Sequence, residues 1–238
     1  MPSVSVERIR LPYTDVVVGT GEPIEGKNLV EFRLIYQGRL PSTGNKGRPR
    51  EAQTIRRAFH PQLKRLWSVK SGLQELAEVK GIAAASKDKE FYDSLNISWP
   101  AAGIIAMGRK WNKGGFDFVP LVTPEITLRC ILDILILRPE EKRFIFSRGD
   151  LDGQLATLFD ALAVPQHAEQ IFPEDIQADE KPLFCFLQDD KLVSEVRVVA
   201  DELLLLPGQH ELQADDVFAI VHVRLNHVGS FPFDRWFD

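Results

Sequence analysis

The 238-residue sequence is poor in the features that mark secreted and membrane proteins. It holds only two cysteines, Cys130 and Cys185, which excludes the disulfide scaffold of a small secreted domain. No run of about 18 apolar residues is present, so no membrane-spanning helix is expected. The segment Met1–Glu7 lacks the basic and then apolar layout of a signal peptide. We therefore expect a cytoplasmic protein in which both cysteines are reduced thiols of the core.

Residue types that carry out metal or nucleophilic chemistry are also scarce. The five histidines do not cluster, and His222 and His227 would lie on opposite faces of a continuing strand, which argues against a zinc site. The glycines of Val18–Gly21 are too few for a phosphate-binding loop, and no helix is expected directly after them. No serine or cysteine stands in a recognisable nucleophile elbow. The acidic residues are therefore the main candidates for chemistry.

Charge is distributed unevenly along the chain. Residues 1–120 hold 19 Lys and Arg against 12 Asp and Glu, whereas residues 121–238 hold 10 against 22. The net charge is −5, yet Glu51 is the only acid between positions 39 and 70, where the basic residues are Arg39, Lys46, Arg48, Arg50, Arg56, Arg57, Lys64, Arg65 and Lys70. Because phosphates need nearby cations, a basic segment beside an acidic half suits a nuclease. The alternative is an ordinary basic helix face exposed to solvent.

Two acidic pairs stand out in the second half. Asp150 and Asp152 are two residues apart, and Asp189 and Asp190 follow on a later segment. Mg²⁺ is a hard ion that takes oxygen ligands at about 2.0–2.1 Å, so carboxylates from a turn and a later strand suit it. Such an ion activates water and stabilises the leaving oxygen in phosphodiester cleavage. The alternative is that Asp152 is a helix N-cap and Asp150 a solvated turn residue.

The hydrophobic pattern predicts an α+β fold. Alternating or continuous apolar runs predict strands, and apolar spacings of three and four predict helices. The expected strands are 29–36, 116–119, 127–137, 143–146, 183–187, 193–199 and 217–225. The expected helices are 51–67, with Pro61 as the point where it kinks or breaks, 73–79, 87–95 and 153–162, while 99–115 is expected to be irregular. The long apolar run of 127–137 predicts a strand buried on both faces.

The segment 150–162, which reads DLDGQLATLFDAL, resembles the signature of the RusA family of Holliday-junction resolvases. That signature reads D-x-D-N, then a lysine three residues on, then D-A-L at the end of a helix. The segment 187–199, LQDDKLVSEVRVV, is similar to the family's second motif, in which a hydrophobic strand end runs into Asp-Asp and a further strand. The resemblance implies a RusA-like mixed sheet packed against helices, as a single domain over residues 1–238.

The resemblance also implies a site and its chemistry. It implies a homodimer that binds branched or duplex DNA, such as four-way junctions, and cuts it with Mg²⁺ or Mn²⁺. The metal-binding and catalytic acids carried over are Asp150, Asp152 and Asp190, whereas Asp160 matches a structural aspartate of the family. The basic residues expected to contact nucleic acid are Arg48, Arg50, Arg56, Arg57 and Arg148.

Two positions depart from the family pattern. Gly153 stands where the family has asparagine, and Ala156 stands where it has its catalytic lysine. An ammonium there would stabilise charge on the phosphate, and loss of such a group costs about 10²–10³ in rate. The alternative to an endonuclease is therefore a catalytically impaired homologue that acts as a nucleic-acid-binding or protein-interaction module. Residues 39–115 have no counterpart in the family and are expected to form a basic helical insertion.

Overall fold

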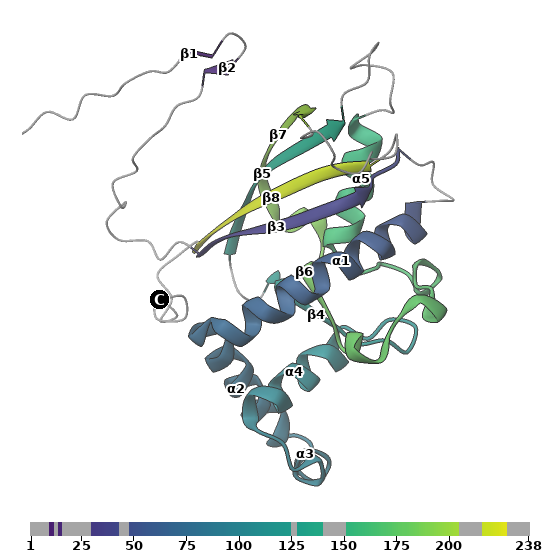
Figure 1. The fold of residues 1–238 in the computed structure, drawn as a ribbon. Coiled ribbons are helices and arrows are strands. Elements are labelled where there is room, and N and C mark those ends of the chain that lie inside the picture. Colours follow the sequence, from purple (N-terminus) through teal and green to yellow (C-terminus); the bar gives the residue numbers. More distant parts are fainter. Residues whose placement is uncertain are drawn as a thin grey trace, which may run out of the picture.

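The computed structural model has an α+β fold (Figure 1). It describes residues 10–11, 14–15, 30–42, 48–124, 128–139, 151–204 and 216–227. The strands are β1 (Arg10–Leu11), β2 (Thr14–Asp15), β3 (Val30–Arg39), β4 (Phe118–Val122), β5 (Leu128–Pro139), β6 (Leu183–Leu187), β7 (Val193–Leu203) and β8 (Asp216–His227). The helices are α1 (Arg48–Val69), α2 (Ser71–Ala85), α3 (Lys89–Leu95), α4 (Trp99–Lys110) and α5 (Leu151–Leu162). Short 3₁₀ turns lie at Ala168–Gln170, Pro173–Asp175, Ala178–Glu180 and Asp190–Leu192.

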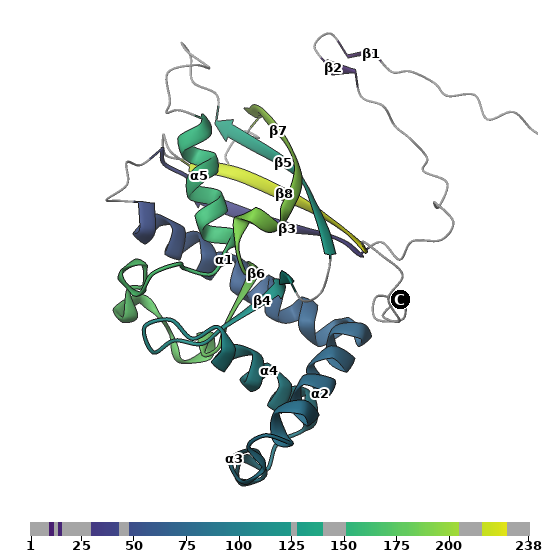
Figure 2. The ribbon, with the colours of Figure 1, turned by 180° about the vertical axis from the view of Figure 1, so that it is seen from behind.

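The larger sheet is mixed, as the sequence predicts. Its strand order is β3-β8-β5-β7, with β8 antiparallel to both β3 and β5 and with β7 parallel to β5. β4 and β6 form a separate parallel pair. Because β5 and β7 are parallel, the chain between them must return along the sheet, and α5 lies on this return path (Figure 2).

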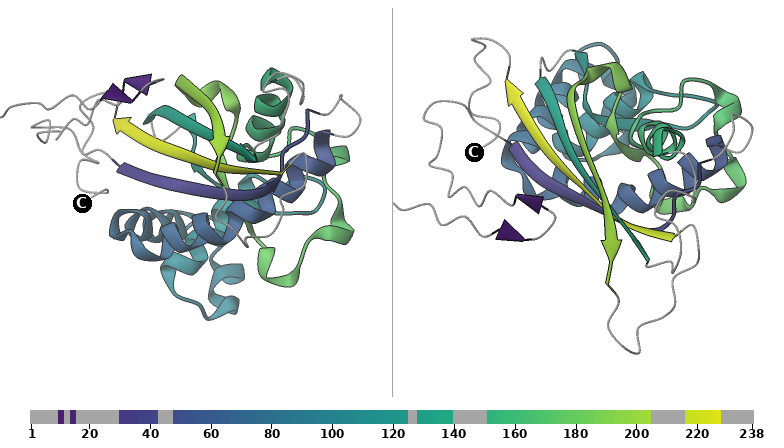
Figure 3. Two further views of the ribbon diagram at one scale, coloured as in Figure 1. Left: turned by 45° about the horizontal axis from the view of Figure 1, so that its top comes forward. Right: turned by 90° about the horizontal axis from the view of Figure 1, so that it is seen from above.

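One face of the larger sheet carries the core. Along β5, Cys130, Leu132, Ile134 and Ile136 are at most 2% exposed, and they join residues of α1 and α5 in one hydrophobic cluster. On the opposite face Leu135 is only partly buried within the described chain. The prediction that this strand is buried on both faces is therefore wrong, because α1 and α5 pack on the same side of the sheet (Figure 3).

α1 is longer than predicted and continues through Pro61. Its stripe of Ile55, Phe59, Leu63 and Trp67 is at most 4% exposed and has the helical spacing expected from the sequence. A proline inside a helix removes a backbone hydrogen bond and costs about 3 kcal/mol. Burial of this stripe against the sheet offsets that cost, so the helix does not end at the proline.

The stretch 99–115, expected to be irregular, contains α4. Pro100 is the second residue of this helix, where a missing N–H leaves no intrahelical bond unmade. α4 packs along α2 so closely that a Cβ at Gly103 would lie 1.5 Å from the Ala77 carbonyl oxygen. Close packing against a neighbouring helix therefore decides this segment, where local signals alone are weak.

The expected insertion is divided between two parts of the fold. α2, α3 and α4 have a small cluster of their own around Ala85, Tyr92 and Ala102. The main core takes Ile55 and Phe59 from α1, and it also takes Leu76 from α2 and Met107 from α4. The part of 39–115 that projects away from the larger sheet is therefore α2 to α4, and α1 belongs to the central fold (Figure 1).

Both cysteines are buried, unpaired thiols, as predicted. Burial raises the pKa of Cys130 and of Cys185 to about 12, so neither is a reactive thiolate near neutral pH. Among the described residues, no helix is both long enough and apolar enough to cross a bilayer.

Candidate functional site

The first acidic motif leads into α5. The helix begins at Leu151, so Asp152 is its exposed second residue rather than its N-cap. The Asp152 Oδ1 accepts a hydrogen bond from the Gly153 N–H at 2.9 Å. A carboxylate in the first turn also meets the positive end of the helix dipole favourably. Asp150 and Arg148 lie outside the described residues.

Buried polar side chains fix the first turns of α5 to the end of β3. The Gln154 amide donates to the Leu40 carbonyl oxygen at 2.8 Å and accepts a hydrogen bond from Arg138 at 2.5 Å. The Thr157 hydroxyl donates to the Pro41 carbonyl oxygen at 3.3 Å. Gln154 and Thr157 are at most 4% exposed, and satisfied polar groups in so buried a place hold their elements rigidly. The position of Asp152 is therefore set by the core.

The same contact with the end of β3 explains Gly153. A Cβ at this position would lie 2.2 Å from the Ser42 Oγ and 3.2 Å from the Ser42 Cβ, so a larger residue requires Ser42 to move. Ala156 is four residues from both Asp152 and Asp160, so it is the neighbour of both carboxylates on one helix face. Neither Gly153 nor Ala156 supplies the polar group of the family pattern.

The second acidic motif lies in the turn between β6 and β7. Asp189 accepts a hydrogen bond from the Lys191 N–H at 3.0 Å, and this bond is the main cause that lowers the pKa of Asp189. The pKa of Asp190 is raised, first by burial, then by its hydrogen bond with Asp189 and by the Asp189 charge. The two carboxyls therefore titrate as a pair, in which Asp190 takes up a proton first as the pH falls.

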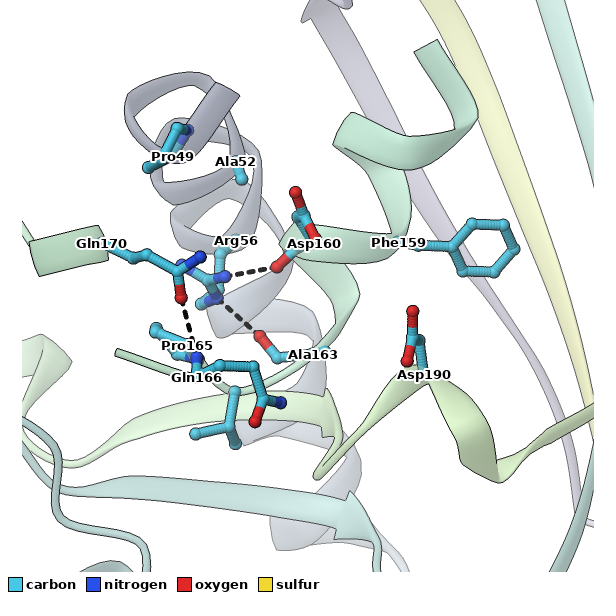
Figure 4. A pocket seen from close by; sticks show the side chains of 11 residues that line it. Pro49, Ala52, Arg56, Phe159, Asp160, Ala163, Pro165, Gln166, Gln170 and Asp190 are labelled. Carbon is cyan, nitrogen blue, oxygen red and sulfur yellow. Dashed lines mark hydrogen bonds between the residues drawn. The ribbon is translucent and has the colours of Figure 1, made fainter. Parts of the chain in front are cut away.

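Asp190 points toward the C-terminal end of α5 across a small cavity of about 60 Å³ (Figure 4). The cavity is lined by Pro49, Ala52, Arg56, Phe159, Asp160, Ala163, Val164, Pro165, Gln166, Gln170 and Asp190. Burial raises the pKa of Asp160, the charges of Arg48 and Arg56 oppose this shift, and the charge of Asp190 adds to it. A space of this size holds a few waters or a small ion but not a nucleotide.

Arg56 has a structural place in the wall of this cavity. It is 4% exposed, its Nε donates to the Ala163 carbonyl oxygen at 2.9 Å, and its Nη2 donates to the Asp160 carbonyl oxygen (Figure 4). These carbonyls lie at the end of α5, where helix carbonyls lack intrahelical partners. The predicted phosphate contact is therefore corrected for Arg56, because its guanidinium caps α5 and joins it to α1.

The two acidic motifs lie at opposite ends of α5. β7 starts beside the start of β5, with Val193 opposite Cys130, whereas α5 starts after the end of β5. Asp152 and Asp160 are separated by about 12 Å along the helix axis, at roughly 1.5 Å per residue, and Asp190 lies at the Asp160 end. Within the described residues, no three His, Cys, Asp or Glu side chains are grouped as metal ligands. The described part of one chain therefore does not assemble the expected Mg²⁺ site.

The exposed start of α1 faces an acidic segment of the same chain. Arg50 pairs with Glu174 at 2.7 Å and with Asp175 at 3.6 Å, and its guanidinium lies 4.5 Å from the centroid of the Phe172 ring. The side chains of Arg50 and Glu174 are 55% and 60% exposed. Such an exposed pair is worth at most about 1 kcal/mol, so a phosphate group can compete for Arg50.

Further along α1, the ion pair between Arg57 and Glu180 is more enclosed than that of Arg50. The Arg57 Nε donates to both carboxylate oxygens of Glu180, at 2.8 and 2.9 Å, and Lys64 donates to the Asp179 carbonyl oxygen at 3.0 Å. Glu180 is buried. Part of the basic run of α1 is therefore used inside the fold, where it meets the acidic residues of the chain's second half.

A buried histidine beside this interface is a residue that sequence reasoning missed. His60 is 3% exposed, and its Nδ1 accepts a hydrogen bond from the Phe184 N–H at 2.9 Å. Burial, followed by the charge of Lys64, lowers the pKa of His60, so the ring is neutral at pH 7 with its proton on Nε2. His60 follows Arg56 by four residues and precedes Leu63 by three, and this helical spacing predicts that it lies on the inward face of α1.

Comparison with known proteins identifies no relative of this chain. No protein-family model matches it, and neither a curated protein nor a solved structure matches it. The assignment of a function therefore depends on the residues and the geometry described above.

Proposed function

We propose that this chain is a RusA-like endonuclease that acts on branched or duplex DNA as a homodimer. The observation that carries this proposal is the placement of both acidic motifs on one β5-α5-β7 unit, one at each end of α5. Asp152 and Asp190 are both exposed, which leaves their carboxylates within reach of a metal ion and of DNA. The α+β class with a mixed sheet and α5 on its core face supports the proposal at the level of fold class.

A two-fold dimer accounts for the separation of the acids along α5. In an isologous interface each contact occurs twice, so Asp150 and Asp152 of one protomer can meet the partner subunit's Asp190 and form two equal sites. Carboxylates are the ligands that Mg²⁺ and Mn²⁺ prefer. The ion would supply an activated water and stabilise charge at the leaving oxygen.

The DNA-facing cations of this proposal are Arg48, Arg50 and Arg148. Arg56 and Arg57 are left out because their guanidinium groups bind within the fold. Arg50 can exchange Glu174 for a phosphate, since that pair is exposed. Each phosphate contact adds about 0.9 to the slope of log affinity against log salt concentration, so Arg50→Gln should reduce that slope by about this amount.

Cleavage of a labelled four-way junction in Mg²⁺ or Mn²⁺ tests the proposed activity. We expect the wild type to cut and Asp190→Asn, which keeps the side-chain size but removes its charge, to leave the junction intact. Asp93→Asn is a matched control, because Asp93 lies on α3 in an exposed pair with Lys89 and should not affect cutting. A wild-type protein that leaves the junction uncut, while a known resolvase cuts it, overturns the proposal.

A second function, binding of nucleic acid without cleavage, is favoured by the surroundings of Gly153 and Ala156. Gly153 is packed against Ser42, so the family's asparagine would require Ser42 to move, and Ala156 cannot supply an ammonium. This alternative predicts salt-sensitive junction binding with no cleavage product. A gel-shift measurement on the cleavage samples distinguishes the two functions.

A further inference from the structure

The α2 to α4 projection contains a cavity much larger than the one beside Asp190. It has a volume of about 510 Å³, within the range of roughly 300–1,000 Å³ that is typical of small-molecule sites. It lies between α2 and α4 and is bounded by the start of α3 and by Thr123, directly after β4. Its lining residues are Leu76, Lys80, Ala83, Ala84, Lys87, Asp88, Tyr92, Ala106, Met107, Lys110, Trp111 and Thr123.

The packing of the two helices explains why this space stays open. α2 and α4 are in backbone contact at Gly103, where a Cβ would lie 1.5 Å from the Ala77 carbonyl oxygen, and at Gly81, where it would lie 2.4 Å from the Trp99 carbonyl oxygen. Beside these contacts the lining positions carry alanines, which are too short to fill the space. The close contacts at Gly81 and Gly103 therefore fix the spacing of the two helices beside the cavity.

The lining combines an apolar surface with an excess of positive charge. Leu76, Met107 and Trp111 supply apolar and aromatic walls, and Lys80 and Lys87 stand on α2 and directly after it. In the described part of the chain, neither of these two lysines makes an ion pair. Lys110 adds a third ammonium, whose Nζ lies 5.0 Å from the centroid of the Trp111 ring.

The only carboxylate among the lining residues, Asp88, has an arginine close by. Asp88 lies 4.0 Å from the guanidinium of Arg109. Positive charge therefore dominates the cavity, and a ligand that enters it gains most if it carries an anionic group.

We propose that this cavity binds a small amphipathic anion, namely a carboxylate or phosphate with an apolar, preferably aromatic, body. The anionic group lies near Lys80 and Lys87, and the body packs against Trp111. This gives the α2 to α4 projection a role in small-molecule binding, whether or not the chain cuts DNA.

The test uses the full chain and 8-anilinonaphthalene-1-sulfonate, an aromatic anion whose fluorescence rises when it is bound. We expect saturable binding of one probe per chain and a rise in the melting temperature, because a ligand of the native state stabilises it. Adenosine monophosphate and laurate are then added as competitors. Displacement by the first identifies a phosphate ligand, displacement by the second identifies a carboxylate ligand, and displacement by neither overturns the proposal.

Variants separate this cavity from other surfaces. Lys80→Gln/Lys87→Gln should weaken probe binding by about tenfold or more, because both ammonium groups near the anionic group are lost. Lys70→Gln/Lys89→Gln changes the net charge equally outside the cavity and should bind like the wild type. Equal weakening by both double variants would mean that only net charge matters and would overturn the proposal.

Ala84→Phe fills the cavity and tests independently whether the probe binds there. It should abolish saturable binding while circular dichroism stays that of the wild type. If Ala84→Phe does not fold, the lysine variants still decide the question. Unchanged affinity in a folded Ala84→Phe protein would show that the probe binds elsewhere.

Discussion

Replacement of Arg56 by methionine removes a buried guanidinium and keeps most of the side-chain volume. This guanidinium donates to the carbonyl oxygens of Asp160 and Ala163 at the end of α5, and Arg56 is 4% exposed. Methionine has no donor, so both carbonyls lose a partner in a place that water reaches poorly. The attachment of α5 to α1 should therefore weaken.

The expected magnitude follows from the two bonds. A hydrogen bond from a charged donor contributes about 1.5–3 kcal/mol, so the loss of both bonds to the carbonyls costs about 3–6 kcal/mol. Methionine also relieves the cost of burying a charge, so we expect the free energy of unfolding to fall by about 3–4 kcal/mol. For a chain of this size each kcal/mol shifts the melting temperature by about 2–4 °C, so a decrease of roughly 6–16 °C is expected.

Urea denaturation followed by circular dichroism measures this loss. Arg50→Met, on the same helix but in an exposed ion pair, is the matched control and should cost at most about 1 kcal/mol. Arg56→Lys should give an intermediate loss, since an ammonium keeps the charge but lacks the planar fork that reaches two carbonyls. Equal urea midpoints for Arg56→Met and Arg50→Met would refute the capping role.

Three further predictions concern the histidine and α5. His60→Asn, whose amide oxygen can accept a hydrogen bond from the Phe184 N–H, should lessen the loss of stability on acidification. In the wild type the pKa of His60 is lower in the folded state than its unfolded value of about 6.5, so the unfolded state binds more protons. The free energy of unfolding of the wild type therefore falls as the pH drops below about 6.5. Urea midpoints from about pH 8 to about pH 5 check this, and identical profiles would contradict it. Gly153→Asn should destabilise by about 1–3 kcal/mol through Ser42, and Ser42→Gly should recover most of that loss in the double variant; thermal melts that show simple additivity would rule out the contact. Ala156→Lys should gain about 0.3–1 kcal/mol from the carboxylates one turn away on either side, and a gain that persists in about 1 M salt would argue against this electrostatic cause.

Much of the core could be predicted from local periodicity. The apolar stripe of α1 follows a spacing of 3.6 and the strands β3 and β8 a spacing of 2, while β6 is a short continuous apolar run. The continuation of α1 through Pro61 and the formation of α4 could not be predicted, because each depends on burial against another element. The sequence around Gly103 does not predict that this residue packs against Ala77.

The candidate site was located only in part. Asp152 and Asp190 were found through their motifs, but their placement at opposite ends of α5 depends on β7 being parallel to β5, which no local pattern encodes. The charge pattern was misleading for Arg56 and Arg57, because it records where charges lie along the chain and not which partners the fold brings to them. The acidic partner Glu180 is 123 residues away from Arg57 in sequence.

Cleavage by mixed subunits tests the proposed dimeric site most directly. Asp152→Asn and Asp190→Asn should each leave a four-way junction uncut on their own. After equal amounts exchange subunits, about half of the dimers are mixed and each mixed dimer carries one intact site, so about a quarter of the wild-type activity should return. A mixture as inactive as its two components, beside a wild type that cuts, would contradict a site shared between two copies of the chain.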